Sequence, residues 1–167
     1  MNFEKLHAGD TYLYSGIIYT ARDQAHLRLK KYLEEGREIP VDFENSLIYY
    51  AGPTPSKPGK AVGSIGPTTS SRMDKFIDIM PSLKVSGMIG KGPRDKSVIE
   101  ACKKYKLVYF VVTGGCGALL SEKVVSAQEV MFPDLGCESI KKLYVKDFPL
   151  IVAYDIYGNN VFERNID

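Results

Sequence analysis

The sequence predicts an α/β domain, for three reasons. Residues 107–112 form a continuous run of β-branched and aromatic side chains, which is typical of a strand in a sheet covered on both faces. The strand-like run 12–19 is followed at once by a helical pattern at 22–33. A second short strand at 86–90 leads into a further helical pattern at 94–105. Strands that alternate with helices indicate a sheet on which helices pack.

Length, charge and cysteine content narrow the class of protein. A chain of 167 residues has room for one hydrophobic core, so we expect a single domain over residues 1–167. The net charge of +2 gives no reason to expect a nucleic-acid partner. The start of the chain is polar and no apolar run approaches about 18 residues, so we expect neither a signal peptide nor a membrane span. The widely spaced Cys102, Cys116 and Cys137 fit neither a disulfide framework nor a metal knuckle, which favours a reducing, cytoplasmic setting.

The first half of the chain predicts a strand, a helix and a second strand. Gly16 is expected to kink the first strand, and Gly36 stands where the C-terminal cap of the first helix belongs. Residues 46–51 form a short apolar strand, and the prolines of 52–59 indicate an extended loop. The next helical pattern ends at Met80-Pro81, and its expected buried stripe consists of Met73, Phe76, Ile77 and Met80.

The second half of the chain predicts further strands. The helix at 94–105 is expected to pack through Val98, Ile99, Cys102 and Tyr105. The glycines of 113–117 indicate a tight turn, and they lack the third glycine of a dinucleotide fingerprint. Residues 124–132 and 149–154 are typical strands. Gly158-Asn159 is placed to turn a closing hairpin with residues 161–162.

The segment 63–74 is the strongest candidate for an anion-binding corner. Gly63 and Gly66 would let the backbone approach a ligand, and the four hydroxyls of 68–71 could cap the following helix, whose first N–H groups would face an anion. Arg72, one turn inside, could add a bidentate fork for a carboxylate or phosphate. The spacing alone fits equally well a hydroxyl-rich helix start with a surface arginine.

Two more cations lie at predicted strand ends. Arg22, beside Asp23, is at a junction where open α/β folds commonly hold ligand groups, and Lys91 stands between two glycines. Either side chain could bind an anion or be a solvated surface residue. The pattern around Lys91 is not a P-loop, because Gly92 stands where Ser or Thr would be needed. His26 is expected to pack or cap rather than to catalyse.

Four ordered motifs carry a resemblance to a known family. They are Tyr19-Thr-Ala-Arg22-Asp23-Gln-Ala-His26, Gly66-Pro-Thr-Thr-Ser-Ser-Arg72-Met-Asp74, Gly90-Lys91-Gly92 and the closing Phe132-Pro-Asp134-Leu-Gly136 with Phe148-Pro149 and Ala153-Tyr154-Asp155. Together they resemble the C-terminal domain of the iron–sulfur hydro-lyases, namely class I fumarate hydratase and the related L(+)-tartrate dehydratase, over roughly 9–164.

The resemblance implies a fold, a partner and a cofactor. The fold would be a swivelling β/β/α domain, in which mixed sheet layers carry packed helices. A chain that starts at its own methionine is similar to the separate β subunit of such enzymes. The resemblance then implies an α subunit as partner, in an α2β2 assembly. The α subunit would hold a [4Fe–4S] cluster whose open iron acts as a Lewis acid. No metal ligand is expected in this chain, which alone should be inactive.

The resemblance also implies site residues. Arg22, Arg72 and Lys91 would bind the carboxylates of a C4 dicarboxylate, Thr68 would bind substrate and take part in proton transfer at carbon, and Thr69 would bind or cap. A threonine hydroxyl is a poor base in water, so Thr68 requires activation by its surroundings. The resemblance leaves fumarate/malate and tartrate/oxaloacetate open as substrates, leaves the role of Cys116 open, and competes with a non-catalytic anion-binding or scaffold domain of the same fold.

Overall fold

The computed structural model describes residues 1–112 and 116–163. Its elements are β1 (Thr11–Thr20), α1 (Asp23–Glu34), β2 (Leu47–Tyr49), the 3-10 helix η1 (Ser70–Ile79), α2 (Met80–Leu83), β3 (Gly87–Gly90), α3 (Lys96–Tyr105), β4 (Val108–Val111), α4 (Gly117–Ser121), β5 (Val124–Met131), the 3-10 helix η2 (Pro133–Glu138), β6 (Ile140–Tyr154) and the 3-10 helix η3 (Val161–Glu163). The prediction of a mixed α/β domain is confirmed.

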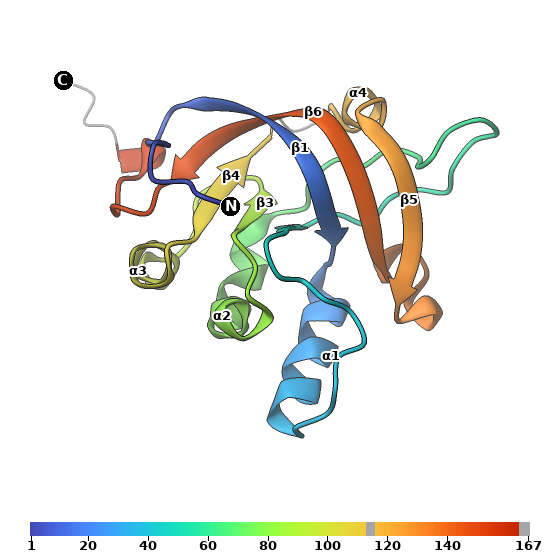
Figure 1. Cartoon of the computed structure of the whole chain (residues 1–167), viewed down its shortest axis with the longest axis horizontal. Helices are drawn as coiled ribbons and strands as arrows, with labels where there is room; N and C mark the ends of the chain where they lie inside the picture. Colours follow the sequence, from blue (N-terminus) through green and yellow to red (C-terminus); the bar gives the residue numbers. More distant parts are fainter. Residues whose placement is uncertain (113–115, 164–167) are drawn as a thin grey trace.

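The strands of the described residues form one sheet that closes on itself (Figure 1). β1, β2, β3 and β4 are parallel in that order, and β6 runs antiparallel to both β4 and β1. These pairings close the ring β1-β2-β3-β4-β6, and β5 lies outside it, antiparallel to β6. Helices α1, α2 and α3 lie together on one side of this sheet (Figure 1).

Two hydrophobic clusters explain why the parallel strands are apolar on both faces. Leu47, Tyr49 and Phe110 point into the cluster enclosed by the ring of strands. Their neighbours Ile48 and Tyr109 point to the cluster under the helices, with residues of α1, η1 and α3. Successive strand side chains point to opposite faces, so a strand covered on both sides must be apolar throughout. The expectation for residues 107–112 is therefore confirmed.

β6 is the longest strand and was only partly predicted, from residue 149 onward. Its first half alternates buried residues such as Leu143 and Val145 with exposed charged or polar ones, and the lysines hide this period of two. Pro149 pairs with Leu13 of β1 on one side only. On its other side it lies between the stretch of β6 that pairs with β5 and the stretch that pairs with β4, so its missing N–H is tolerated there.

Several local predictions are wrong or untested. Residues 161–162 belong to η3 rather than to a hairpin strand, although Tyr154 and Asn160 form an isolated bridge across the predicted turn. Tyr105 is 44% exposed and does not belong to the buried face of α3. The predicted turn at 113–117 lies largely outside the described residues.

The helix after the anion-binding corner also differs from expectation. Residues 70–79 form a 3-10 helix, because Met73, Phe76 and Ile79 are buried at a spacing of three. Ile77 of the predicted stripe is only partly buried. Helical structure continues past the expected end at Met80-Pro81, because Pro81 lies in the first turn of α2, where a missing N–H is harmless.

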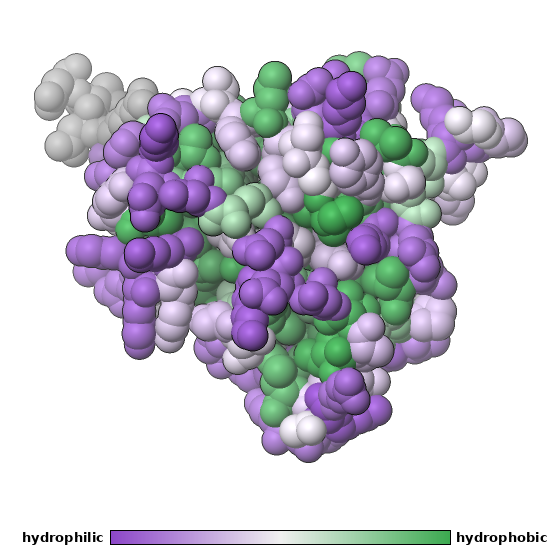
Figure 2. Space-filling view, viewed as in Figure 1, coloured by the Kyte–Doolittle hydropathy of each residue, from purple (hydrophilic) through white to green (hydrophobic). Residues whose placement is uncertain are grey.

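On the face of the molecule shown in Figure 2, hydrophilic and apolar residues are interspersed. Among residues 1–112 and 116–163, the structure contains no helix that is both long and apolar enough to span a membrane.

Candidate active site

The predicted site residues gather at the carboxyl ends of three neighbouring parallel strands. Arg22 follows the end of β1, and Lys91 follows the end of β3 directly. The backbone N–H of Thr68 donates to the carbonyl of Tyr50, the residue after β2, at 2.8 Å. Carboxyl ends of parallel strands meet at one edge of a sheet, which is where open α/β folds bind ligands. The closed topology thus brings three distant segments together.

Thr68 and Arg72 are in direct contact. The Arg72 Nη2 donates to Thr68 Oγ1 at 2.5 Å, and the Arg72 Nε lies 3.5 Å from the carboxylate of Asp23, which is Arg22's neighbour. Thr68 is half-buried, and the Arg72 side chain is 49% exposed. Because the hydroxyl oxygen accepts from a cation, negative charge on that oxygen is stabilised and its own proton is left to donate elsewhere.

Lys91 is tied to the segment that carries Thr68 by backbone pairing. Residues 69 and 91 form an isolated parallel bridge. Ser70 fixes it from both sides, since its N–H donates to the Lys91 carbonyl at 3.2 Å and its Oγ accepts from the Lys91 N–H at 2.9 Å. The Lys91 and Thr69 side chains are exposed. Their backbones are therefore fixed while the side chains face solvent.

Gly90 makes this pairing possible, and Gly90→Ala is expected to lower the free energy of unfolding by about 2 kcal/mol. An added Cβ would collide with the Ser70 hydroxyl and lie 2.9 Å from the Tyr50 ring. Urea unfolding measures the change. Gly66→Ala is the matched control, because a Cβ there meets its nearest atom, in Gly117, at 3.8 Å. Equal stability of the two variants would contradict the close packing of Ser70 on Gly90.

Arg22 lies beside Gly52. An added Cβ at Gly52 would stand 3.3 Å from the Arg22 Nη1, so glycine leaves the space that the guanidinium fills. The Arg22 Nε lies 3.9 Å from Glu138, too far for a direct hydrogen bond. Within the described part of the chain this Nε is buried and has no hydrogen-bond partner. Arg22 therefore keeps donor capacity for an anion.

His26 packs rather than catalyses, as the sequence suggested. It is 1% exposed, its ring stacks on Phe76 at 5.5 Å, and Nδ1 contacts the Arg22 carbonyl at 2.8 Å. A carbonyl oxygen only accepts, so Nδ1 carries the proton. Burial lowers the pKa of His26 to about 4. The ring is neutral at neutral pH and adds no charge to the site.

In the anion-binding corner the capping role expected of Thr69 is wrong, whereas its binding role stays a prediction. Thr69 is the N-cap of η1, but its side chain makes no capping hydrogen bond, because the backbone there is committed to the bridge with Lys91. Gly63 is required for packing, since a Cβ there would collide with the backbone and side chain of Thr54, and its approach to a ligand stays a prediction.

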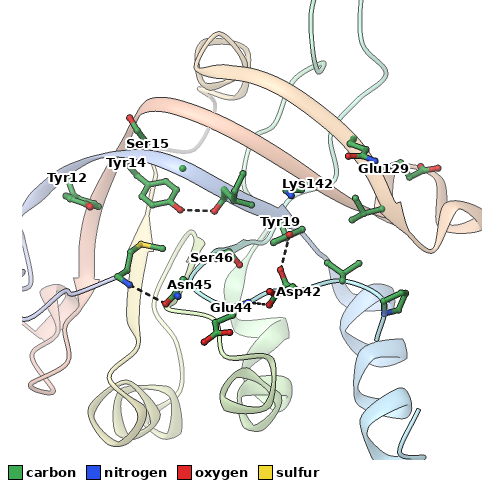
Figure 3. Close-up of a pocket in the computed structure, with 17 residues that line it drawn as sticks. Tyr12, Tyr14, Ser15, Tyr19, Asp42, Glu44, Asn45, Ser46, Glu129 and Lys142 are labelled. Atoms are coloured by element: carbon green, nitrogen blue, oxygen red, sulfur yellow. Dashed lines mark hydrogen bonds between the residues drawn. The ribbon is translucent and has the colours of Figure 1, made fainter. Parts of the chain in front are cut away.

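A separate hollow of about 820 Å³ lies between β1, β5 and the loop 40–46 (Figure 3). Tyr14 and Tyr19 bond to backbone carbonyls of Ile17 and Asp42 there, at 2.8 and 3.1 Å. None of the five predicted site residues lines it. We therefore place the candidate site at the strand ends, where the cations lie, and not in this hollow.

Sequence reasoning missed three supporting residues. Glu138 faces Arg22, Ser70 clamps Lys91, and the Tyr50 carbonyl holds Thr68. Glu138 lies two residues after the closing motif Phe132–Gly136, and that was the only signal for it in the sequence. The contacts of Tyr50 follow from strand order and have no local signature.

Comparison with known proteins identifies the family. The family model described as fumarase C-terminus matches residues 1–165. A Methanocaldococcus jannaschii chain, provisionally named L(+)-tartrate dehydratase subunit beta, is 40% identical over an alignment covering 96% of this chain and 86% of that protein. The L(+)-tartrate dehydratase subunit beta of Escherichia coli is 35% identical, with 98% and 83% covered.

Class I fumarate hydratases match as well. The anaerobic class I fumarate hydratase of Escherichia coli is 38% identical, and the alignment covers 92% of this chain but 28% of that enzyme. This chain thus spans most of the beta subunits and little more than a quarter of the fumarate hydratase. The resemblance seen in the sequence is confirmed, and the chain belongs to the fumarase C-terminal family.

Proposed function

We propose that this chain is the β subunit of a [4Fe–4S] hydro-lyase that reversibly hydrates fumarate to (S)-malate. One observation carries the proposal: in a member of the fumarase C-terminal family, Arg22, Arg72 and Lys91 converge at the ends of three parallel strands around Thr68. We infer that the domain has the swivelling β/β/α arrangement, works in the cytoplasm and forms an α2β2 assembly with its α subunit.

The cations suit a C4 dicarboxylate. Both arginines face carboxylates of this chain at distances beyond a strong hydrogen bond, 3.5 Å for Arg72 and 3.9 Å for Arg22. Their remaining donors are available to the substrate carboxylates, and Lys91 adds a third positive charge. Three cations from separate segments can hold both ends of a dianion and orient its double bond.

Thr68 is the group proposed to move the proton. In hydration its hydroxyl would donate a proton to the substrate carbon, and the oxygen left behind would be stabilised by the Arg72 Nη2 that already bonds it at 2.5 Å. In dehydration the same oxygen would take the proton back. Arg72 supplies the activation that a threonine needs.

The described residues of this chain do not fit a cluster. Among the described residues, no three His, Cys, Asp or Glu side chains gather to hold a metal. Cys102 is buried in α3, and desolvation raises the pKa of its thiol to about 12, so it is not a thiolate ligand at neutral pH. We therefore assign the [4Fe–4S] cluster to the α subunit, and the steps above concern this chain's side chains only.

A second candidate function is dehydration of L(+)-tartrate to oxaloacetate. The alignments that cover 86% and 83% of proteins named L(+)-tartrate dehydratase subunit beta favour it. Both substrates present two carboxylates on a four-carbon chain, so the same cations serve either. A non-catalytic anion-binding domain is the third possibility, and it predicts no cluster-bearing partner.

Anaerobic co-expression with a candidate α chain tests the proposal. We expect a brown complex that interconverts fumarate and malate, with tartrate assayed in parallel and each chain alone as control. A cluster-loaded complex that acts on tartrate and not on fumarate would replace the first function by the second. Failure of every cluster-bearing candidate to bind this chain would favour the non-catalytic domain.

Binding of malate to this chain alone should be weak, with a dissociation constant of about a millimolar or above. Arg72 and Lys91 are exposed, so in this chain alone they cannot enclose a dicarboxylate, and the like charges of the cations repel one another. Isothermal calorimetry measures the affinity, with succinate as the analogue that lacks the hydroxyl group of malate. Micromolar affinity in physiological salt would contradict a site shared with a partner.

A further inference from the structure

A buried ion pair lies directly beneath the candidate site. The Arg94 side chain has no exposed surface, and its Nε donates to the Asp74 Oδ1 at 2.7 Å. Asp74 belongs to η1, two residues after Arg72, and its other oxygen accepts from the N–H of Asp95 at 2.8 Å. The pair thus joins the start of α3 to the segment that carries Arg72.

Tyr50 links the same guanidinium to Thr68. The Arg94 Nη1 donates to the Tyr50 hydroxyl at 2.8 Å, and the Tyr50 carbonyl accepts from the Thr68 N–H at 2.8 Å. The Tyr50 ring, 1% exposed, packs edge-on against His26 at 5.4 Å, and Nδ1 of His26 contacts the Arg22 carbonyl. The segments bearing Arg22, Thr68 and Arg72 all rest on this tyrosine or on the Asp74 pair.

Arg94 is itself held at its backbone and over two rings. The Tyr154 hydroxyl accepts from the Arg94 N–H at 2.6 Å and donates to its carbonyl at 3.1 Å. The guanidinium carbon lies 5.0 Å from the ring centroid of Tyr50 and 5.1 Å from that of Tyr109. The guanidinium fork of Arg94 thus joins η1, β4 and the residue after β2, and its backbone joins this group to β6.

Stability alone is a poor reason for such a pair. Burying two charges costs more free energy than packing apolar side chains of similar volume, so a buried ion pair adds little stability. It does impose direction, because Nε and Nη1 must meet Asp74 and Tyr50, while the buried Nη2 has no hydrogen-bond partner among the described residues. The directions fixed here are those of the Tyr50 carbonyl and of the η1 turn, which position Thr68 and Arg72.

We propose that Arg94 is a positioning residue of the candidate site, acting through Tyr50 on Thr68 and through Asp74 on Arg72. The catalytic consequence rests on the proposed function, whereas the positional one concerns the folded chain alone. Arg94 itself contacts no substrate. A lysine at 94 would keep the charge and lose the fork, so Asp74 and Tyr50 could no longer both be held.

The first test measures position without activity. In a ¹⁵N-labelled chain, Arg94→Lys should selectively lower hydrogen-exchange protection of the Thr68 amide, by roughly tenfold or more, while the Ile18 amide in the core of the sheet stays protected. Arg28→Lys is the matched control, because Arg28 forms a bidentate pair with Asp134 on the surface. Uniform loss of protection at both amides would show a merely structural role and overturn the proposal.

The second test uses the complex reconstituted with the α subunit. Arg94→Lys should lower kcat/KM by about tenfold or more at an unchanged melting temperature, since a misplacement of about 1 Å can cost a hundredfold. If Arg94→Lys does not fold, Asp74→Asn is measured instead and should show the same selective exchange at Thr68. Native exchange at Thr68 together with kcat/KM within about twofold of the wild type would overturn the proposal.

The two tests fail separately. In one outcome, Arg94→Lys selectively lowers protection of the Thr68 amide, but the wild-type complex acts on neither fumarate nor tartrate. That outcome would refute the proposed function and leave Arg94 as a positioning residue. An active wild-type complex in which Arg94→Lys changes neither readout would refute the positioning role alone.

Discussion

Thr68→Val in the reconstituted complex is expected to lower kcat by roughly a hundredfold or more and to change KM much less. Valine is nearly isosteric with threonine, so the fold and the bond from the Thr68 N–H to the Tyr50 carbonyl should persist. What disappears is the hydroxyl that accepts from Arg72 at 2.5 Å. If that hydroxyl moves a proton in the transition state, its loss must appear in kcat.

Two neighbouring hydroxyls serve as controls for this experiment. Ser71→Ala removes an exposed hydroxyl of the same run and should leave both constants unchanged. Thr69→Val removes a predicted binding group and should raise KM more than it lowers kcat. A thermal melt excludes unfolding, and iron analysis confirms the cluster of the complex. A normal kcat with a raised KM for Thr68→Val would leave Thr68 as a binding residue only.

The sequence predicted that Arg22 and Lys91 lie at strand ends, because a clear strand signal precedes each of them. Arg22 and Lys91 were located by the apolar strands that precede them, and those strands follow β1 and β3 closely. The segment around Thr68 has no such strand. Its place beside Tyr50 follows from the parallel order β1-β2-β3, which strand patterns alone do not determine.

The helix type of η1 could not be decided from its side chains. Met73, Phe76 and Met80 fit an α-helical stripe, whereas Met73, Phe76 and Ile79 fit the period of three of a 3-10 helix. Both sets are present in the sequence. Both sets are buried in the structure, since Ile79 is 4% exposed and Met80 is 1% exposed, and only Ile77 of the predicted stripe is left partly outside.

The buried support of the site was invisible to spacing arguments. Arg94 and Tyr50 are separated by 44 residues and Arg94 and Asp74 by 20. An arginine just before a helix is normally a solvated residue, because cations are unfavourable near a helix N-terminus. The fold reverses that expectation by placing Asp74 and two tyrosine rings around it.

Arg72→Lys is expected to lower kcat/KM of the complex by about 2 kcal/mol or more in apparent transition-state free energy, roughly thirtyfold. The arginine uses Nη2 for Thr68 and presents Nε to Asp23 at 3.5 Å, so one planar group serves two partners and keeps donors for a substrate carboxylate. A lysine ammonium is a point charge without that fork. It could replace the charge at one partner but could not both activate Thr68 and bind a carboxylate in two-point fashion.

The measurement for Arg72→Lys is steady-state kinetics with fumarate and with tartrate, beside a thermal melt. Arg28→Lys again supplies a control, since its partner Asp134 is exposed and the Phe132 ring under its guanidinium is likewise none of the predicted site residues. Arg72 is 49% exposed, so its replacement should leave stability nearly unchanged and any loss of activity must come from the site. Because Arg72 touches Thr68, the two substitutions should not be additive: Thr68→Val combined with Arg72→Lys should lose less than the sum of the separate effects. Activity of Arg72→Lys within about twofold of the wild type would remove Arg72 from the site and, with it, the proposed activation of Thr68.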